Sequence, residues 1–399
     1  MERVFGLFGL VVLLAIAWIL SENRSRLNWR LIGSGLALQG LLALLLLHTA
    51  PGQVVFDVAR LAVNKVIAFS NEGARFVFGD LVEAALFGFS VLPMIIFVSS
   101  ITSILFYLGC IQWIVRQMAR VMVRVMGASG SESMAAAANV YLGASTAPLV
   151  ILPYLKTMTR SEIMAVMTSG MATVAGSVLA AYVALGADAG HLLAASLMSA
   201  PAALVVAKIM TPETETSRTM GVVTVDVPKP GVNFIDAACS GASDGLRLAL
   251  NVAAMLIIAI AFVSLFNWVV GLAPYVGGEP LSLERMLGWL CAPLALFMGV
   301  AWEDAQAVGM LIGKKTILNE FLAYQDLSAM QAQLSERSFA IATYALCSFA
   351  NFGTIAIMIG GIGGLVPERR KDIARFGIRS MIGGALAANM TATVAGLLM

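Results

Sequence analysis

Long runs of apolar residues, separated by short polar segments, occupy most of this 399-residue chain. A helix of about 17–25 apolar residues is long enough to cross a hydrocarbon core of about 30 Å. Eight runs are that long, so the pattern predicts eight transmembrane helices. They cover residues 4–20, 31–48, 82–108, 160–186, 190–209, 247–272, 338–364 and 377–398.

Two other segments carry charged residues among aliphatic ones at helical spacing. Residues 52–79 and 111–127 follow this pattern, which is typical of amphipathic helices lying along a membrane interface. The stretch 211–243 is the only long polar segment, and we expect it in water. It ends in "GASDGLRLALN", which indicates a short helix leading into the next span.

Basic residues predict the orientation of the spans. The first interhelical loop, "SENRSRLNWR", and the last, "PERRKDIARFGIR", are both rich in arginine. Cytoplasmic loops carry an excess of Lys and Arg, so both loops are expected on the cytoplasmic side. With an even number of spans, both termini then lie outside. The first apolar run lacks a basic leader and a small-residue cleavage site, so we expect it to remain as a span.

Two polar-interrupted segments are too short to cross the membrane as single helices. Residues 131–158 are interrupted at Gly143 and Pro148, and their first leg, 131–142, spans only about 18 Å at 1.5 Å per residue. Residues 302–327 have the same form, with Gly313 and a polar cluster at the centre. Each segment is therefore expected to form a re-entrant helical hairpin.

The segment after each hairpin is also interrupted. Both begin with Ser-Glu, at Ser161 and Ser335, and both have a small or polar break about 15 residues later. The breaks fall at Gly176–Ser177 and between Asn351 and Thr354. Paired interrupted helices in two halves predict an inverted repeat, with a transport site near the midplane.

This organisation suggests four functional segments. Residues 1–130 would form scaffold spans and interfacial helices, and 131–210 the first transport half. Residues 211–300 would hold the cytoplasmic loop and a scaffold span, and 301–399 the second transport half.

Composition agrees with an all-α integral membrane protein. The chain is 59% hydrophobic and 12% charged, whereas a soluble protein carries about 25% charged residues. Long apolar runs favour helices over a β-barrel. With a net charge of +2 and no basic tract, nucleic acid is not expected as a partner.

Catalytic and metal motifs are missing from the sequence. The four cysteines lack CxxC spacing and only two histidines are present, so haem, iron–sulfur and zinc sites lack ligands. No Ser-His-Asp set, HExxH or P-loop pattern is present, which argues against an enzyme.

The polar residues at the breaks allow two interpretations. In the first interpretation, Gly176 only allows helices to pack closely, and Asn319 and Glu320 belong to a surface loop. Alternatively, Asn and Glu at membrane depth are costly, and such residues are functional by default.

One stretch matches a known family signature. "GKKTILNEFLAY" (313–324) fits the pattern G-x-K-x-x-x-N-E-F-x-A of the concentrative nucleoside transporter family. Other segments resemble that family too. They are "NEGARFVFG" (71–79), "PETE" (212–215), "GASDGLRLALNVAAML" (241–256), "SFANFGTIAIMIGGIGGLVPERR" (348–370) and "TATVAGLL" (391–398). The resemblance implies eight spans and two re-entrant hairpins per protomer, a homotrimer, and inward transport of nucleosides with sodium or protons.

The resemblance also implies a substrate site and a cation site. The ribose would be held by Glu320, Asn351 and Thr354, with Phe349 packed nearby. The remaining candidate substrate contacts are Asn319, Ser145 and Thr146. Sodium would bind the side chains of Asn139 and Ser177 and the carbonyls of Leu142 and Val178. These ligands are all oxygens, as a hard cation prefers.

The first hairpin departs from the family pattern. Its tip reads Gly143-Ala144-Ser145-Thr146 where the family has G-Q-T/S-E, so recognition of the base is left open. Losing that glutamate favours sodium over protons as the coupling ion, although Glu320 remains a protonatable carboxylate.

These inferences predict a sodium-driven symporter that imports nucleosides across the cytoplasmic (inner) membrane. Its expected partners are the nucleoside, membrane lipid and two further copies of the chain. The alternatives are proton coupling, an atypical nucleoside-like substrate, a channel, or a non-transporting membrane protein with gate hairpins.

Overall fold

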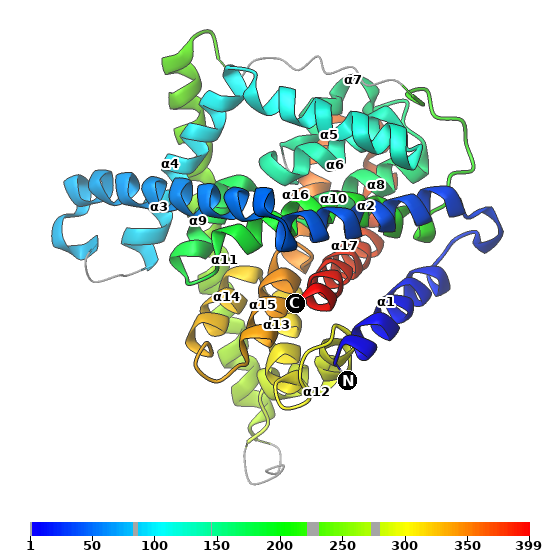
Figure 1. Cartoon of the computed structure of the whole chain (residues 1–399). Coiled ribbons are helices and arrows are strands. Elements are labelled where there is room, and N and C mark those ends of the chain that lie inside the picture. Colours follow the sequence, from blue (N-terminus) through cyan, green and yellow to red (C-terminus); the bar gives the residue numbers. More distant parts are fainter. Residues whose placement is uncertain (1, 83–86, 145, 222–230, 273–279) are drawn as a thin grey trace.

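A computed structural model describes residues 2–82, 87–144, 146–221, 231–272 and 280–399. Within them the fold is all-helical, as predicted (Figure 1). Six helical segments of the described chain are long and apolar enough to cross a membrane, judged by length and composition. Two further apolar helices are shorter: α1 (Glu2–Ile19), and α16 (Phe352–Leu365).

The continuous helices agree with most of the predicted segments. α2 (Trp29–His48) is capped by Asn28 and α10 (Ala189–Met210) by Asp188, in each case through a side-chain oxygen that accepts a backbone N–H. The others are α3 (Ala50–Phe78), α4 (Phe87–Tyr107), α5 (Cys110–Met126) and α17 (Arg370–Leu398). The interfacial positions of α3 and α5 stay predictions.

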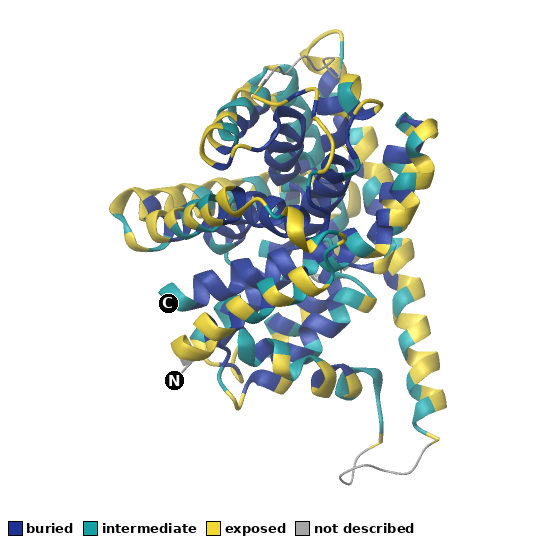
Figure 2. Cartoon of the chain, turned by 90° about the vertical axis from the view of Figure 1, so that its right-hand side faces the viewer, coloured by how far each residue is buried: buried dark blue, intermediate teal, exposed yellow. Residues whose placement is uncertain are grey.

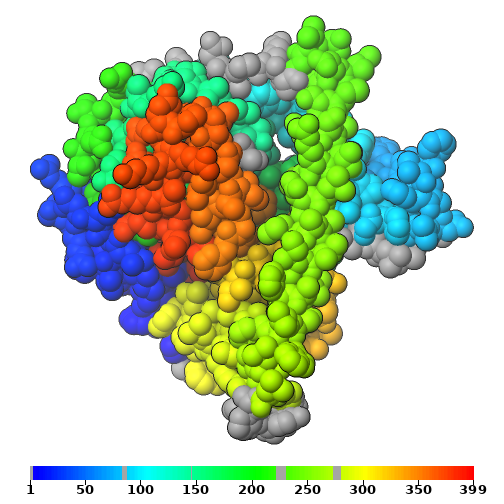
Figure 3. Space-filling view, turned by 180° about the vertical axis from the view of Figure 1, so that it is seen from behind, coloured from blue at the N-terminus to red at the C-terminus, as the bar shows by residue number. Residues whose placement is uncertain are grey.

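The predicted lead-in helix and the span after it form one element. α11 runs without interruption over Phe234–Val270, and its 37 residues extend about 55 Å at 1.5 Å per residue. The expected short separate helix is therefore wrong, because no residue between 241 and 251 ends the hydrogen-bonded ladder. Figure 3 shows α11 along one side of the molecule from one end to the other.

Another helix was not predicted from the sequence. α12 (Leu283–Phe297) begins at the Ser282 cap and packs against α13 (Ala305–Ile317). At 15 residues it is shorter than a span, and the apolar pattern alone did not mark it.

The core lies among α10, α17 and α8 (Arg160–Ala172), whereas α4 and α11 lie at the edge (Figure 2). In the apolar span of α10, 89% of the residues are buried, against 11% in α11. Most exposed side chains in the apolar span of α11 are themselves apolar, which fits a surface covered by lipid or another subunit rather than by water.

Both predicted hairpins contain a helix, a break and a second helical segment. The first consists of α6 (Gly130–Leu142), η3 (Ala147–Ile151) and α7 (Leu152–Leu155). The second consists of α13 and α14 (Glu320–Ala329). Their re-entrant path through a bilayer stays a prediction.

The second break lies in the predicted polar cluster, but its predicted position at Gly313 was wrong. Gly313 lies inside α13, and a Cβ on it would meet the Leu287 Cβ at 2.7 Å. Its small size permits the close approach of α12 to α13. The chain breaks instead at Leu318, and the side chain of Asn319 caps the following helix.

Both predicted interruptions of spans exist. α8 ends at Ala172 and α9 (Gly176–Ala184) follows, so the break covers residues 173–175, just before the predicted position. α15 (Glu336–Leu346) and α16 are separated by residues 347–351.

The polar stretch 211–243 was expected in water, but part of it is buried against the protein. Gly130 N donates to Thr219 O at 2.8 Å, and Ser217 and Thr219 are buried against the start of α6. Lys208, also buried, pairs with Glu132 at 2.7 Å. The first part of the stretch therefore covers the base of the first hairpin. Residues 222–230 lie outside the described residues.

At the other end of α10 from Lys208, the start of the helix is tied to α3. Arg60 pairs with Asp188 at 2.7 Å. Partial burial raises the pKa of Asp188, but the hydrogen bonds from Arg60 and the His191 N–H, together with the nearby positive charges, outweigh it, and the pKa lies below its ordinary value.

Candidate functional site

The two interrupted spans meet at their breaks. Phe349 N, between α15 and α16, donates to Thr173 O, between α8 and α9, at 3.2 Å. Broken helices leave backbone groups unpaired, and such groups are tolerated at membrane depth where they face protein, water or ligand. This contact pairs one donor with one acceptor across the two halves of the chain.

Asparagine side chains begin the helices on both sides of this junction. Asn351 Oδ1 accepts from Thr354 N at 2.9 Å and from Thr354 Oγ1 at 3.0 Å, which caps α16. Asn319 Oδ1 accepts from Leu322 N at 3.0 Å, which caps α14. Asn is among the residues most favoured at this position, because its short side chain reaches the orphan N–H groups.

Glu320 connects three of these elements. It is the first residue of α14 and is only 4% exposed. Its Oε2 accepts from Asn351 Nδ2 on α16 at 3.0 Å, and its Oε1 accepts from the Tyr182 hydroxyl on α9 at 2.9 Å. The positive end of the α14 dipole stabilises a carboxylate at this position.

The two lysines of the signature have different roles. Lys314 Nζ pairs with Asp326 Oδ2 at 2.6 Å, which joins the two arms of the second hairpin. Lys315 is fully buried, and its Nζ donates to Ala345 O at 3.0 Å and Ser348 Oγ at 2.9 Å. Ala345 lies in the last turn of α15, where the helix dipole favours a cation. Lys315 thus joins the second hairpin to the end of α15.

The candidate cation residues lie where the first hairpin touches the break before α9. A Cβ on Gly176 would lie 3.1 Å from Tyr141 O, and a Cβ on Gly143 would lie 2.6 Å from the Ala175 Cβ. The end of α6, which carries Leu142, therefore contacts the start of α9, which carries Ser177 and Val178. The four proposed ligands come from these two adjoining ends.

Asn139 has an unused oxygen. The residue is 1% exposed, and its Nδ2 donates to Ser169 Oγ at 3.0 Å. Among the described residues its Oδ1 finds no hydrogen-bond partner. A buried unpaired acceptor costs about 1–3 kcal/mol, so this oxygen is suited to a ligand.

The tip of the first hairpin, residues 143–146, differs from the family pattern, and only part of it lies within the described residues. Ala144 is 5% exposed and lies close to α8, since a Cβ on Gly170 would be 3.1 Å from the Ala144 Cβ. Thr146 is exposed, and Ser145 lies outside the described residues.

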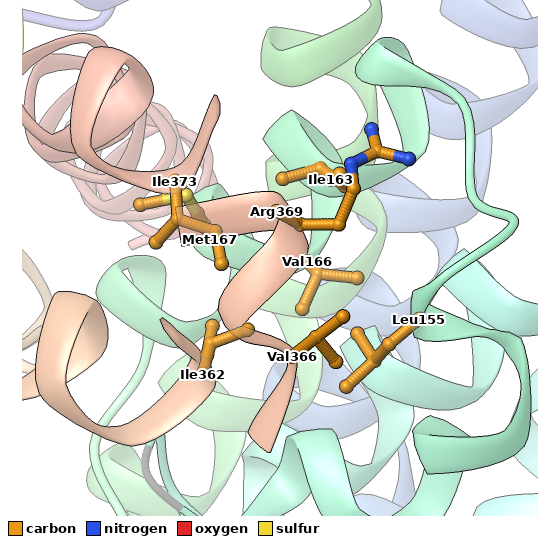
Figure 4. Close-up of a pocket in the computed structure, with 8 residues that line it drawn as sticks. All are labelled: Leu155, Ile163, Val166, Met167, Ile362, Val366, Arg369 and Ile373. Atoms are coloured by element: carbon orange, nitrogen blue, oxygen red, sulfur yellow. The ribbon is translucent and has the colours of Figure 1, made fainter. Parts of the chain in front are cut away.

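Two cavities of the described structure lie away from Glu320. One, of about 10 Å³, is apolar and has Arg369 at its edge (Figure 4). The other, of about 700 Å³, lies between the start of α3 and the N-terminal end of α15, with Arg60 and Glu336 in its lining. The candidate site is therefore described by its polar contacts and not by either of these two cavities.

Comparison with known proteins decides the family. A family model described as "Na+ dependent nucleoside transporter C-terminus" matches residues 191–396, and the corresponding N-terminal model matches residues 8–81. A third, "Gate: Nucleoside recognition", matches residues 88–189. The chain is also 42% identical to an uncharacterized transporter of Haemophilus influenzae over 100% of this chain and 98% of that one. The chain belongs to the Na⁺-dependent nucleoside transporter family.

Named relatives and solved structures agree. The chain is 41% identical to mouse solute carrier family 28 member 3 and 37% identical to mouse sodium/nucleoside cotransporter 1, in each case over its full length. It spans only 59% and 64% of those longer proteins. Among solved structures, CNTnw in an inward-facing substrate-bound state is 40% identical, with a TM-score of 0.94 over 100% of this chain and 98% of that one. An outward-facing CNTnw variant gives a TM-score of 0.93 at 39% identity over the same shares.

The family is one of nucleoside transporters and not of enzymes, as the missing catalytic motifs predicted. In this member of the nucleoside transporter family, Glu320, Asn351 and Thr354 lie together, and Phe349 lies beside them at the break. The Asn319 side chain caps α14 through its Oδ1, and its contact with substrate stays a prediction.

Sequence reasoning missed two members of the Glu320 cluster of this transporter. Lys315 was part of the signature but received no role. Tyr182 lies in "SVLAAYVALG", an ordinary apolar segment, and a lone tyrosine there gives no signal beyond its polar hydroxyl. Only the packing of α9 against α14 reveals its contact with the carboxylate.

Proposed function

We propose that the protein imports nucleosides across the cytoplasmic membrane by symport with sodium, and that Glu320 and Asn351 hold the ribose. The observation that carries this proposal is the buried Glu320 carboxylate, which stands at the start of a half-helix and faces Asn351. A carboxylate has about four acceptor positions. Tyr182 and Asn351 each take one, so two vicinal hydroxyl groups of a ribose can donate to the others.

Charge makes this recognition strong. Hydrogen bonds to an ionised acceptor are shorter and about twice as strong as neutral ones. Burial of Glu320 excludes competing water, which increases the electrostatic part of the interaction. Asn351, fixed by Thr354, is able to donate to the sugar or accept from it.

Sodium fits the residues at the end of α6 and the start of α9. The unpartnered Asn139 Oδ1 supplies one oxygen. The carbonyl of Leu142 ends α6, where the last carbonyls of a helix lack intrahelical partners, and Ser177 and Val178 complete the set. Coupling requires that sodium binding and nucleoside binding favour the same conformation.

The test of the ribose assignment is Glu320→Gln in proteoliposomes. The neutral amide keeps the shape but loses the charge, so the KM for uridine or adenosine is expected to rise about 10- to 100-fold. Glu303→Gln is the matched control, because Glu303 is exposed, and it is expected to behave as wild type. Unchanged uptake by Glu320→Gln would remove the ribose assignment.

The coupling ion is tested in the same vesicles with the two gradients imposed separately. An inward sodium gradient is expected to drive accumulation of nucleoside, and a proton gradient alone is not. Accumulation driven by protons without sodium would contradict the proposed symport and support Glu320 as a proton carrier.

A further inference from the structure

Tyr182 contributes a fixed hydrogen-bond donor to the site. It is fully buried near the end of α9, and its hydroxyl donates to Glu320 Oε1 at 2.9 Å. Its ring stacks on Tyr324, with centroids 4.8 Å apart and planes 28° apart, and lies against Phe321 at 4.8 Å. Aromatic packing on two sides fixes the ring, so the position of its hydroxyl follows from the fold and not from the bond to Glu320.

Two donors from different helices hold the two oxygens of one carboxylate. Tyr182 on α9 binds Oε1, and Asn351 on α16 binds Oε2. A free Glu side chain has about 1.5–2 kcal/mol of rotamer entropy to lose on binding. Because both oxygens are already held, the remaining acceptor positions of Glu320 point in a set direction before any substrate arrives.

α9 also carries half of the proposed sodium ligands. Ser177 and Val178 lie in its first turn, and Tyr182 follows in the next turn of the same nine-residue helix. A helix this short is expected to move as one piece, because backbone hydrogen bonds link its first turn to the turn that carries Tyr182. A shift at the start of α9 therefore displaces the Tyr182 hydroxyl relative to Glu320.

We propose that Tyr182 is a positioning residue that orients the Glu320 carboxylate for the nucleoside and couples this orientation to occupancy of the cation site at the start of α9. This proposal rests on the ribose assignment made above. It predicts that sodium raises nucleoside affinity partly through the bond between Tyr182 and Glu320. By linkage, nucleoside raises sodium affinity by the same factor.

The experiment compares Tyr182→Phe with Tyr324→Phe. Both changes remove one hydroxyl and keep the stacked rings, but the Tyr324 hydroxyl donates to Thr343 O at 2.8 Å and not to Glu320. Purified full-length protein in nanodiscs is titrated with uridine by calorimetry, at saturating sodium and in choline. The ratio of the two Kd values measures the coupling.

Tyr182→Phe is expected to raise the uridine Kd at saturating sodium about 10-fold, the loss typical of a hydrogen bond to a charged group. It is also expected to bring the coupling ratio toward one. Tyr324→Phe is expected to keep the wild-type ratio. Wild-type affinity and ratio in Tyr182→Phe would overturn the proposal, as would weaker binding with an unchanged ratio.

The double variant Tyr182→Phe/Glu320→Gln separates this proposal from the one it rests on. If Tyr182 acts through the carboxylate, Tyr182→Phe has no further effect on Kd once Glu320 is Gln. Wild-type affinity in Glu320→Gln alone would defeat the ribose assignment. Loss in Glu320→Gln with no change in Tyr182→Phe would defeat only the role of Tyr182. Thermal unfolding of each variant verifies that the protein is folded.

Discussion

At the scale of single residues, the unsatisfied acceptor on Asn139 makes a direct prediction. Its Oδ1 is buried without a partner among the described residues, so sodium binding is expected to recover that cost. Asn139→Ala is expected to raise the sodium concentration for half-maximal uptake about 10-fold or more. The nucleoside KM at saturating sodium is expected to change much less, because Asn139 does not contact Glu320.

Ser133 provides the control for this prediction. It lies on the same helix, is buried, and its Oγ also lacks a partner among the described residues. Six residues separate it from Asn139, which turns it to another face of α6. Ser133→Ala is expected to leave the sodium dependence unchanged. An equal shift in both variants would mean that disturbance of α6, and not a lost sodium ligand, weakens uptake.

At the residue level, the sequence marks positions where polarity conflicts with the surrounding apolar pattern, and the structure brings two of them, Glu320 and Asn351, into contact, while their binding roles stay predictions. Glu320 and Asn351 stand out because a carboxylate and an amide are costly at membrane depth. Tyr182 does not stand out, since tyrosine is ordinary in apolar helices and only its tertiary partner gives it a role. The role of Lys315 was hidden for another reason: its partner is a backbone carbonyl at the end of α15, which no sequence pattern marks.

At the scale of elements, the contact between the first hairpin and the break before α9 depends on Gly143. Its φ is +76°, in the left-handed region, and a Cβ would lie 2.6 Å from the Ala175 Cβ. Gly143→Ala is therefore expected to push the end of α6 away from the start of α9. We expect at least a 10-fold loss in initial uptake rate at wild-type surface expression.

Two variants isolate this contact from backbone strain. Gly127 also has a positive φ, +67°, but a Cβ there meets nothing within 4 Å. Gly127→Ala is thus expected to show only the strain of an αL residue, which lowers the free energy of unfolding by about 1–2 kcal/mol, with near-normal uptake. Ala175→Gly in the Gly143→Ala background removes the opposing methyl and is expected to restore part of the uptake, because the strain of a Cβ at φ 76° and ψ 172° remains. Failure of that rescue would contradict the packing argument.

Prediction of elements worked for long periodic segments and failed at their ends. The interrupted spans were foreseen because small and polar residues cluster at the breaks. The break was wrongly placed at Gly313, because a glycine that permits close packing and a glycine that ends a helix cannot be told apart in the sequence. The length of α11 was missed because its polar first turns lack a terminator before the apolar span.

At the scale of the whole molecule, the two arginine-rich loops come together. Arg379 Nη2 donates to Leu20 O at 2.7 Å, and Glu22 N donates to Met210 O at 2.9 Å. The N- and C-terminal ends lie near each other, with Arg3 Nη2 donating to Met399 O at 3.1 Å (Figure 1). The two loops therefore lie on the same side of the molecule, and the orientation and the homotrimer stay predictions.

The native cysteines offer a test of orientation. Cys110 begins α5 and Cys239 lies near the start of α11, and both are exposed. These ends are adjacent, since Ser103 Oγ, near the end of α4, donates to Ala237 O at 2.7 Å. α4 runs inward from the predicted outer side, so both cysteines are expected to face the cytoplasm. Ala50, at the turn between α2 and α3, is exposed and expected outside.

A membrane-impermeant maleimide distinguishes the two sides in intact cells. In a Cys291→Ser background, Ala50→Cys is expected to be labelled from outside, whereas Cys110 and Cys239 react only after the membrane is permeabilised. The positive-inside rule is the physical reason, because arginine-rich loops resist translocation. Replacing Cys110 and Cys239 by Ser is expected to remove the labelling that permeabilisation adds. Labelling of these two cysteines in intact cells, with Ala50→Cys protected, would invert the orientation and with it the direction in which each hairpin enters the membrane.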